Sequence, residues 1–115
     1  MRRVFVLVLL LYVCGANAAH KLPERVYQKM YCPYNAEVIL PDKTRVDCLT
    51  DSFAIEFDFA PKWAEALGQS LHYARMTGRT PAIFLILEND SDMRYVQQLA
   101  PLCEKYGVWL TLIYY

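Results

Sequence analysis

Hydrophobic and polar residues follow helical spacing in some parts of the chain and strand spacing in others. Leu22, Val26 and Met30 recur every four residues, which is typical of one face of a helix. Short apolar runs bounded by turn residues are typical of strands. In chain order, we predict a helix at 22–31, strands at 36–40, 44–49 and 52–58, a helix at 61–77, a strand at 82–88, a helix at 92–106 and a strand at 108–113.

Proline and glycine mark the ends of several of these elements. Pro61 suits the first position of a helix, while Gly78 and Gly107 follow the last helical residues. The order α-β-β-β-α-β-α-β starts with three strands that can form a meander and continues with helix-strand pairs. This order predicts an α/β (α+β) domain with one mixed sheet flanked by helices.

The first 18 residues have the layout of a secretory signal peptide. Two arginines precede an apolar run over residues 4–13, and the small residues Ala16-Asn17-Ala18 follow. We expect cleavage after Ala18, which gives a signal peptide at 1–18 and a single domain at 19–115. The apolar run is shorter than the roughly 20 residues that span a bilayer, so we expect no permanent membrane anchor. The protein is therefore predicted to be exported, to the periplasm or the outside of the cell.

Export implies an oxidising compartment, in which cysteines pair. The predicted domain keeps Cys32, Cys48 and Cys103, so one disulfide and one free thiol are expected. We predict the pair Cys32–Cys48, because the segment after Pro33 leads into the strand that pairs with the strand of Cys48.

The predicted domain is close to neutral. Of the 12 Lys and Arg residues, Arg2 and Arg3 belong to the signal peptide, so 10 basic side chains remain against 12 acidic ones and the net charge is −2. Proteins that grip duplex DNA tightly usually carry a basic excess. This balance argues against strong and broad binding of duplex nucleic acid.

Two assumed turns decide which strand residues share a face of the sheet. If Thr50-Asp51 is a two-residue turn, Leu49 lies opposite Ser52, and a loop at 41–43 places Leu40 opposite Thr44. One face then carries Glu37, Ile39, Arg45, Asp47, Leu49, Ala54, Glu56 and Asp58. The opposite face is almost wholly apolar and carries Val38, Leu40, Val46, Cys48, Phe53, Ile55 and Phe57.

The first of these faces collects four carboxylates. Acids so close together repel one another, so some of them take up protons or they share a cation. Oxygen ligands suit hard divalent cations such as magnesium. The alternative is a solvated sheet face on which Arg45 pairs with one of the acids.

The helix predicted after these strands carries a polar stripe. Helical spacing aligns Lys62, Glu65, Gln69, Tyr73 and Met76. Lys62 lies in the first turn, where the helix dipole favours acids. A lysine at this unfavourable position, four residues after Asp58, indicates a role beside the carboxylates. The alternative is a surface lysine whose stem covers Trp63.

The order of these motifs resembles the PD-(D/E)xK nuclease superfamily, which has the restriction-endonuclease-like fold. The resemblance covers roughly residues 22–87: Asp47 on a hairpin strand, Glu56 on the next strand, and Gln69-Ser70-Leu71-His72-Tyr73 on the following helix. The pattern QxxxY is known from the exonuclease branch of that superfamily. RVDCLT followed by AIEFDFAPKWAEALGQSLHYA also looks like a group of small, poorly characterised bacterial proteins assigned to that fold.

The resemblance implies a role for each matching residue. Asp47 and Glu56 are expected to bind magnesium or manganese with the Phe57 carbonyl, and Gln69 and Tyr73 to position phosphate or the carboxylates. Either Glu24 or Glu37 is expected to supply the additional acid that some members carry.

Two positions depart from the family pattern. The family's lysine, two residues after the glutamate, is replaced by Asp58, and the proline before the first acid is replaced by Val46. Lys62 is the expected replacement for the lysine, and Asp58 is kept as a candidate catalytic residue because it occupies the lysine position.

The resemblance implies hydrolysis of phosphodiesters in DNA or RNA. The slight acidic excess favours single strands or strand ends as the substrate, because these need fewer phosphate contacts than a duplex does. The alternative function is that of a catalytically inactive nuclease-fold protein, serving as a binding or structural module of the cell envelope.

Overall fold

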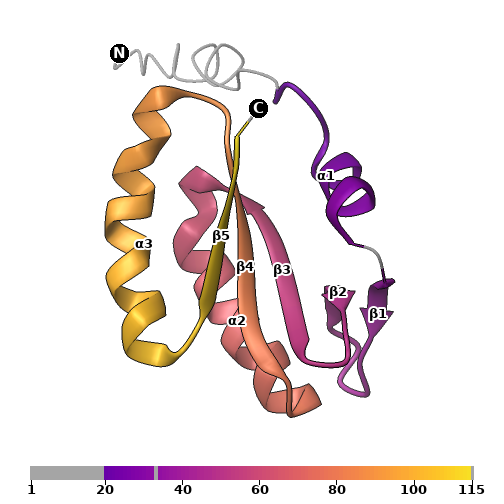
Figure 1. Cartoon of the computed structure of the whole chain (residues 1–115). Coiled ribbons are helices and arrows are strands. Elements are labelled where there is room, and N and C mark those ends of the chain that lie inside the picture. The colour runs from indigo at the N-terminus through magenta and orange to yellow at the C-terminus, as the bar shows by residue number, and fades with distance from the viewer. Residues whose placement is uncertain (1–19, 33, 115) are drawn as a thin grey trace, which may run out of the picture.

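The computed structural model describes residues 20–32 and 34–114 (Figure 1). The predicted order of elements is confirmed within these residues. The elements are α1 (Glu24–Tyr31), β1 (Asn35–Ile39), β2 (Arg45–Leu49), β3 (Phe53–Phe59), α2 (Trp63–Thr77), β4 (Thr80–Leu87), α3 (Met93–Tyr106) and β5 (Trp109–Tyr114). Single 3-10 turns, Ala60–Lys62 and Asp90–Asp92, precede α2 and α3. The predicted signal peptide lies outside the described residues.

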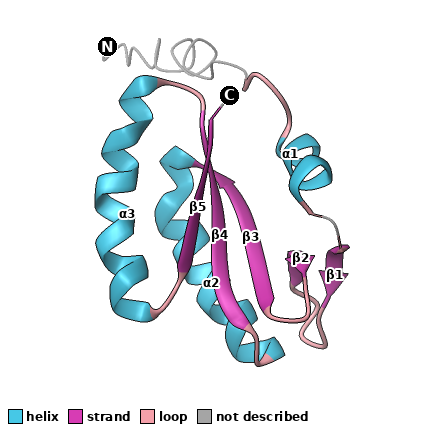
Figure 2. Cartoon of the chain, in the orientation of Figure 1, coloured by secondary structure: helices cyan, strands magenta, loops and turns pink. Residues whose placement is uncertain are grey.

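The five strands form one mixed sheet in the order β1-β2-β3-β4-β5 (Figure 2). Strands β1, β2 and β3 pair antiparallel through hairpins, whereas β3, β4 and β5 pair parallel. Parallel neighbours need a crossover connection, and α2 and α3 supply the two crossovers. A mixed α+β domain is therefore confirmed.

Alternate residues of β4 divide the core into two layers. Ile83 and Leu85 pack with Ala66 of α2 and Leu99 of α3 on one face of the sheet. On the other face, the neighbouring β4 residues Ala82 and Ile86 join a cluster that contains Tyr27 of α1. The sheet thus has α2 and α3 on one side and α1 on the other (Figure 1).

Glycine ends both long helices, as the sequence predicts. Gly78 and Gly107 have φ angles of 70° and 69°, in the left-handed region that glycine adopts without steric cost. Each donates its backbone N–H to the last turn of its helix, Gly78 to the Ala74 carbonyl and Gly107 to the Cys103 carbonyl.

The predicted register of the first hairpin is confirmed, and that of the second is wrong by two residues. In the first, Leu40 donates its N–H to the Thr44 carbonyl at 2.8 Å. In the second, Leu49 lies opposite Ala54 and not Ser52. The turn residues are Asp51-Ser52 because the Thr50 hydroxyl accepts the Phe53 N–H at 2.9 Å and holds the turn one residue later. A shift of two residues leaves every side chain on its predicted face.

The apolar face predicted for β1 and β2 is partly wrong. Leu40 and Val46 pack with Ala54 of β3 and Tyr73 of α2, whereas Cys48 packs with Ile55 and Phe57 in the layer under α1. β2 pairs with β3 only at Cys48 and Leu49. The earlier part of β2, which contains Val46, is therefore free to turn toward α2. The sequence gives no sign of this divergence.

A disulfide joins Cys32, just after α1, to Cys48 in β2, as predicted. Cys103 of α3 is a free and buried cysteine. The disulfide is consistent with an exported protein. None of the helices in the described part of the chain is long and apolar enough to cross a membrane.

Candidate functional site

A hollow of about 340 Å³ lies where β2 and β3 diverge, beside the start of α2. It gathers seven of the candidate residues from α1, β2, β3, the 3-10 turn before α2, and α2 itself, and three further side chains join them. The hollow is lined by Glu24, Thr44, Arg45, Asp47, Glu56, Asp58, Lys62, Glu65, Gln69 and Tyr73. We call this set the acidic hollow. Five of its ten lining residues are Asp or Glu, against two basic residues.

Asp47 is fixed by a hydrogen bond to the backbone of β3. Its Oδ2 accepts the Phe57 N–H at 2.8 Å. Because the ladder between β2 and β3 stops at Cys48, a side-chain carboxylate takes the place of a main-chain partner here. The bond therefore holds the two strands together while it turns the Asp47 carboxylate toward Glu56.

Three of the carboxylates are almost fully shielded from solvent. Asp47, Glu56 and Asp58 are 7%, 5% and 4% exposed. Asp58 accepts the N–H of Phe59 at 3.0 Å, but Oε2 of Glu56 is buried and has no hydrogen-bond partner among the described residues. A buried acceptor without a partner costs free energy unless it holds a proton or a cation.

Burial raises the pKa of each of these acids, and neighbouring carboxylates add to the rise. Burial raises the pKa of Glu56 to about 10, and the neighbouring Asp47 carboxylate adds to the rise. Burial likewise raises the pKa of Asp47, although the Phe57 N–H opposes it. Glu56 therefore holds a proton at neutral pH.

Asp58 and Glu24 lie on the Lys62 side of the hollow. Burial raises the pKa of Asp58 to about 7; the Glu24 carboxylate adds to this rise and Lys62 opposes it. Burial also raises the pKa of Glu24, whose Oε1 accepts a hydrogen bond from Gln28 at 3.1 Å. The first helix thus contributes an acid to the hollow.

The two cations of the acidic hollow are not paired with its acids. Lys62 and Arg45 are both exposed, and within the described part of the chain neither forms an ion pair with Asp47, Glu56 or Asp58. The alternative in which Arg45 neutralises one acid is therefore not seen. Burial has the larger effect on the acids, but the charge of Arg45 opposes the raised pKa of Asp47 and the charge of Lys62 opposes that of Asp58.

Gln69 and Tyr73 reach the acidic hollow from α2, one helical turn apart. Tyr73 is 6% exposed and packs against Val46 and Ala54. Burial raises the pKa of its hydroxyl to about 12, and the carboxylates of Glu56 and Asp47 add to the rise. Tyr73 therefore stays neutral and keeps its hydroxyl proton as a hydrogen-bond donor.

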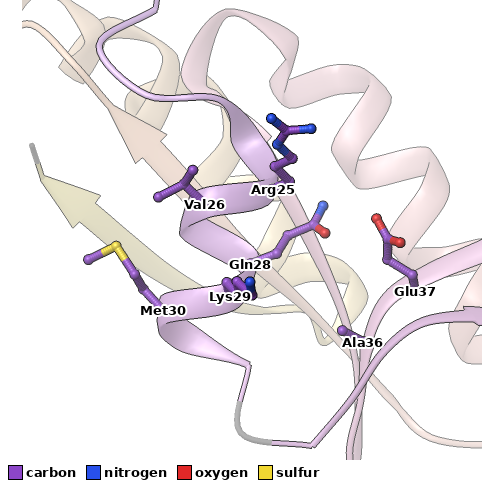
Figure 3. Close-up of a pocket in the computed structure, with 7 residues that line it drawn as sticks. All are labelled: Arg25, Val26, Gln28, Lys29, Met30, Ala36 and Glu37. Carbon is purple, nitrogen blue, oxygen red and sulfur yellow. The ribbon is translucent and has the colours of Figure 1, made fainter.

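Glu37 is not part of this site. It is exposed and lines a different hollow, between α1 and β1, with Arg25 and Gln28 (Figure 3). Its φ of 54° takes it out of the β1–β2 ladder, which skips from the pair Ala36–Cys48 to Val38–Val46. Of the two candidates for the additional acid, the structure brings Glu24 to the site.

The sequence did not indicate Thr44 as a lining residue. Thr44 follows the β1–β2 turn, where its hydroxyl donates to Asp42 at 2.6 Å. Asp42 also contacts His72 of α2 at 2.7 Å, so this turn is tied to the helix that carries Gln69 and Tyr73. Arg45 was assigned to the acidic face from its alternation in the strand, but Thr44 has no comparable signal.

A magnesium site here would rest on few protein ligands. No group of three or more His, Cys, Asp or Glu residues in the described part of the chain is arranged to hold a metal ion. Magnesium commonly binds through one or two carboxylates and retains several waters. Asp47 and Glu56, with the partnerless Oε2 of Glu56, fit that smaller donor set.

Known proteins offer no match to this chain. Neither a protein family, nor a curated protein, nor a solved structure is significantly similar to it.

Proposed function

We propose that this protein is an exported, metal-dependent phosphodiesterase that hydrolyses DNA or RNA, with a restriction-endonuclease-like core. The observation that carries the proposal is the composition of the acidic hollow. Three buried acids lie in one hollow with a glutamine, a neutral tyrosine and a lysine that forms no ion pair within the described residues. Such a set combines oxygen ligands for a divalent cation with donors for a phosphate.

Asp47 and Glu56 are the proposed ligands of magnesium or manganese, together with the carbonyl of Phe57. The Phe57 N–H already holds Asp47, so the backbone of Phe57 lies against the proposed ligands. A bound divalent cation would lower the pKa of a water molecule and stabilise negative charge on the phosphate.

The other side chains of the acidic hollow have proposed roles toward the phosphate. Lys62 lies at the start of α2 with an exposed ammonium group, and it replaces the family's lysine. It orients the attacking water and stabilises the charge that develops on the phosphate. Gln69 and Tyr73 donate hydrogen bonds to phosphate oxygens, and Asp58 lies near enough to Lys62 for the two charges to act on each other.

Cleavage assays test this function with isosteric variants. We expect cleavage of single-stranded DNA or RNA with magnesium or manganese, none with EDTA, and at least about 100-fold slower cleavage by Asp47→Asn and Glu56→Gln. Glu104→Gln, an exposed acid on α3, is the matched control and should cleave at the wild-type rate.

The competing function is that of a catalytically inactive module of the cell envelope with the same fold. The presence of Asp58 at the lysine position favours it, because a buried carboxylate there cannot replace an ammonium group. Absence of cleavage with every metal and substrate, from a correctly folded and oxidised protein, would rule out the nuclease and leave this alternative.

A further inference from the structure

A second hollow, of about 630 Å³, lies between α1 and the edge strand β1 (Figure 3). Its α1 side carries the exposed cations Arg25 and Lys29, one helical turn apart. The β1 side contributes a single acid, Glu37, whose side chain points into the same gap as Arg25 and Gln28 (Figure 3). We call this hollow the α1–β1 groove.

The α1–β1 groove adjoins the acidic hollow through one pair of residues. Gln28 lines the groove, and its amide donates a hydrogen bond at 3.1 Å to Glu24, which lines the acidic hollow. Glu24 and Gln28 are one turn apart on α1, so one helix borders both hollows. A chain molecule that lies along α1 can therefore reach both.

Exposed aromatic rings stand where α1 connects to β1. Tyr31 ends α1 and Tyr34 precedes β1, and they are 43% and 62% exposed. Proteins that bind single strands combine cations that follow the phosphates with aromatic rings on which bases stack. The two cations line the groove, and the two rings lie outside its lining, at the end of α1 and just before β1. A purely apolar peptide would leave Arg25 and Lys29 without partners.

We infer that the α1–β1 groove binds single-stranded nucleic acid and leads the strand to the acidic hollow. Arg25 and Lys29 contact phosphates, and Tyr31 and Tyr34 stack on bases. Glu37 opposes the strand by like charge. This inference rests on the proposed function, because it describes how the substrate of that function is held outside the site of cleavage.

The test is the binding of a fluorescein-labelled oligothymidylate by fluorescence anisotropy, in EDTA so that no cleavage occurs. We expect Arg25→Ala/Lys29→Ala to weaken binding at least about tenfold and to lower the salt slope by about 1.4, for the loss of two phosphate contacts on a single strand. Tyr34→Ala should weaken binding about fivefold or more. Arg94→Ala/Lys105→Ala, which removes two exposed cations from α3, is the matched control and should bind as the wild type does.

Glu37→Gln gives a result of opposite sign, which misfolding cannot produce. Removal of this like charge should tighten binding of the oligothymidylate. The inference is overturned if the double variant binds as tightly as the wild type, if the α3 control loses as much, or if Glu37→Gln does not tighten binding. It is also overturned if a polyglutamate peptide displaces the oligothymidylate and the binding of that peptide is weakened equally by Arg25→Ala/Lys29→Ala.

Failure of the inference and failure of the proposed function are distinguishable. If the groove variants do not affect cleavage, the proposed nuclease function stands and the proposed role of the groove is refuted. If the oligothymidylate binds as expected but is not cleaved in magnesium or manganese, the proposed role of the groove stands and the proposed nuclease function is refuted.

Discussion

At the scale of single residues, the acidic hollow concentrates buried acids without a paired cation. Asp47, Glu56 and Asp58 are all less than a tenth exposed, and neither Lys62 nor Arg45 forms an ion pair with them. An arrangement of this kind destabilises the fold unless protons or a cation are bound, and such perturbed groups are typical of functional sites. The ordinary solvated sheet face considered from the sequence would leave these acids exposed.

Lys62 can be tested separately from the metal ligands. Lys62→Met keeps the aliphatic stem and removes the ammonium group, so we expect cleavage to fall about 100- to 1,000-fold while metal binding is unchanged. Since the side chain is exposed, unfolding free energy should change by no more than about 0.5 kcal/mol. Cleavage at the wild-type rate by this variant would show that Lys62 has no part in the reaction.

The raised pKa values make stability depend on pH in a definite direction. The folded protein keeps protons on Asp58 up to about pH 7 and on Glu56 up to about pH 10, whereas the unfolded chain releases them near pH 4. The folded state therefore binds more protons across this window, and these two groups lower stability as pH rises through it.

Glu56→Gln should remove the Glu56 part of this dependence. We expect the variant to be more stable than the wild type by more than about 1 kcal/mol at pH 9, and to lose that advantage near pH 4. Urea unfolding at several pH values measures the difference. A wild-type stability that rises from pH 5 to pH 9 relative to Glu56→Gln would contradict the pKa values of the hollow.

At the scale of elements, the disulfide secures the helix that supplies Glu24. It joins the end of α1 to β2 at Cys48, directly beside Asp47, and closes a loop with a sequence separation of 16. In the chain-entropy model, closing a loop of about this length stabilises a protein by about 3 kcal/mol.

Removal of the disulfide should therefore lower the stability of the whole domain. We expect Cys32→Ala/Cys48→Ala to lose about 3 kcal/mol of unfolding free energy in urea. Wild-type protein unfolded in the presence of a reductant should show about the same loss. A loss below about 1 kcal/mol in both experiments would mean that packing of Tyr27 alone holds α1 in place.

Element types were predictable from the sequence because local signals determine them. Gly78 and Gly107 end helices where predicted, and the strands follow their apolar runs. The register of the second hairpin was not predictable, since a hydrogen bond from Phe53 to the Thr50 side chain decides it. The site survived that error because the shift was an even number of residues, which keeps Asp47, Glu56 and Asp58 on one side.

At the scale of the whole molecule, long-range contacts determine which of the candidate residues meet in the acidic hollow, and the sequence alone predicts this only in part. Alternation in strands and spacing in α2 placed Asp47, Glu56, Lys62, Gln69 and Tyr73 together correctly. The choice between Glu24 and Glu37 needed the path of α1 across the sheet and the backbone conformation of Glu37. The divergence of β2 from β3, which opens the hollow, has no local sequence signal either.

The acidic and basic side chains of the predicted domain gather in different places. Its slight acidic excess argues against a broad grip on duplexes, yet the acids gather in the acidic hollow while Arg25 and Lys29 lie in the neighbouring α1–β1 groove. Local separation of charge thus makes a nucleic-acid substrate compatible with a near-neutral protein.

Titration calorimetry with manganese tests the central claim, that the acidic hollow binds a divalent cation, most directly. In two buffers of different ionisation enthalpy at pH 8, the wild type should show one saturable site and release about one proton, because a metal ligand must be deprotonated and Glu56 holds a proton. Asp47→Asn and Glu56→Gln should abolish binding, and Glu104→Gln should retain it. Absence of saturable binding by the wild type, or equal binding by Glu56→Gln, would contradict the account.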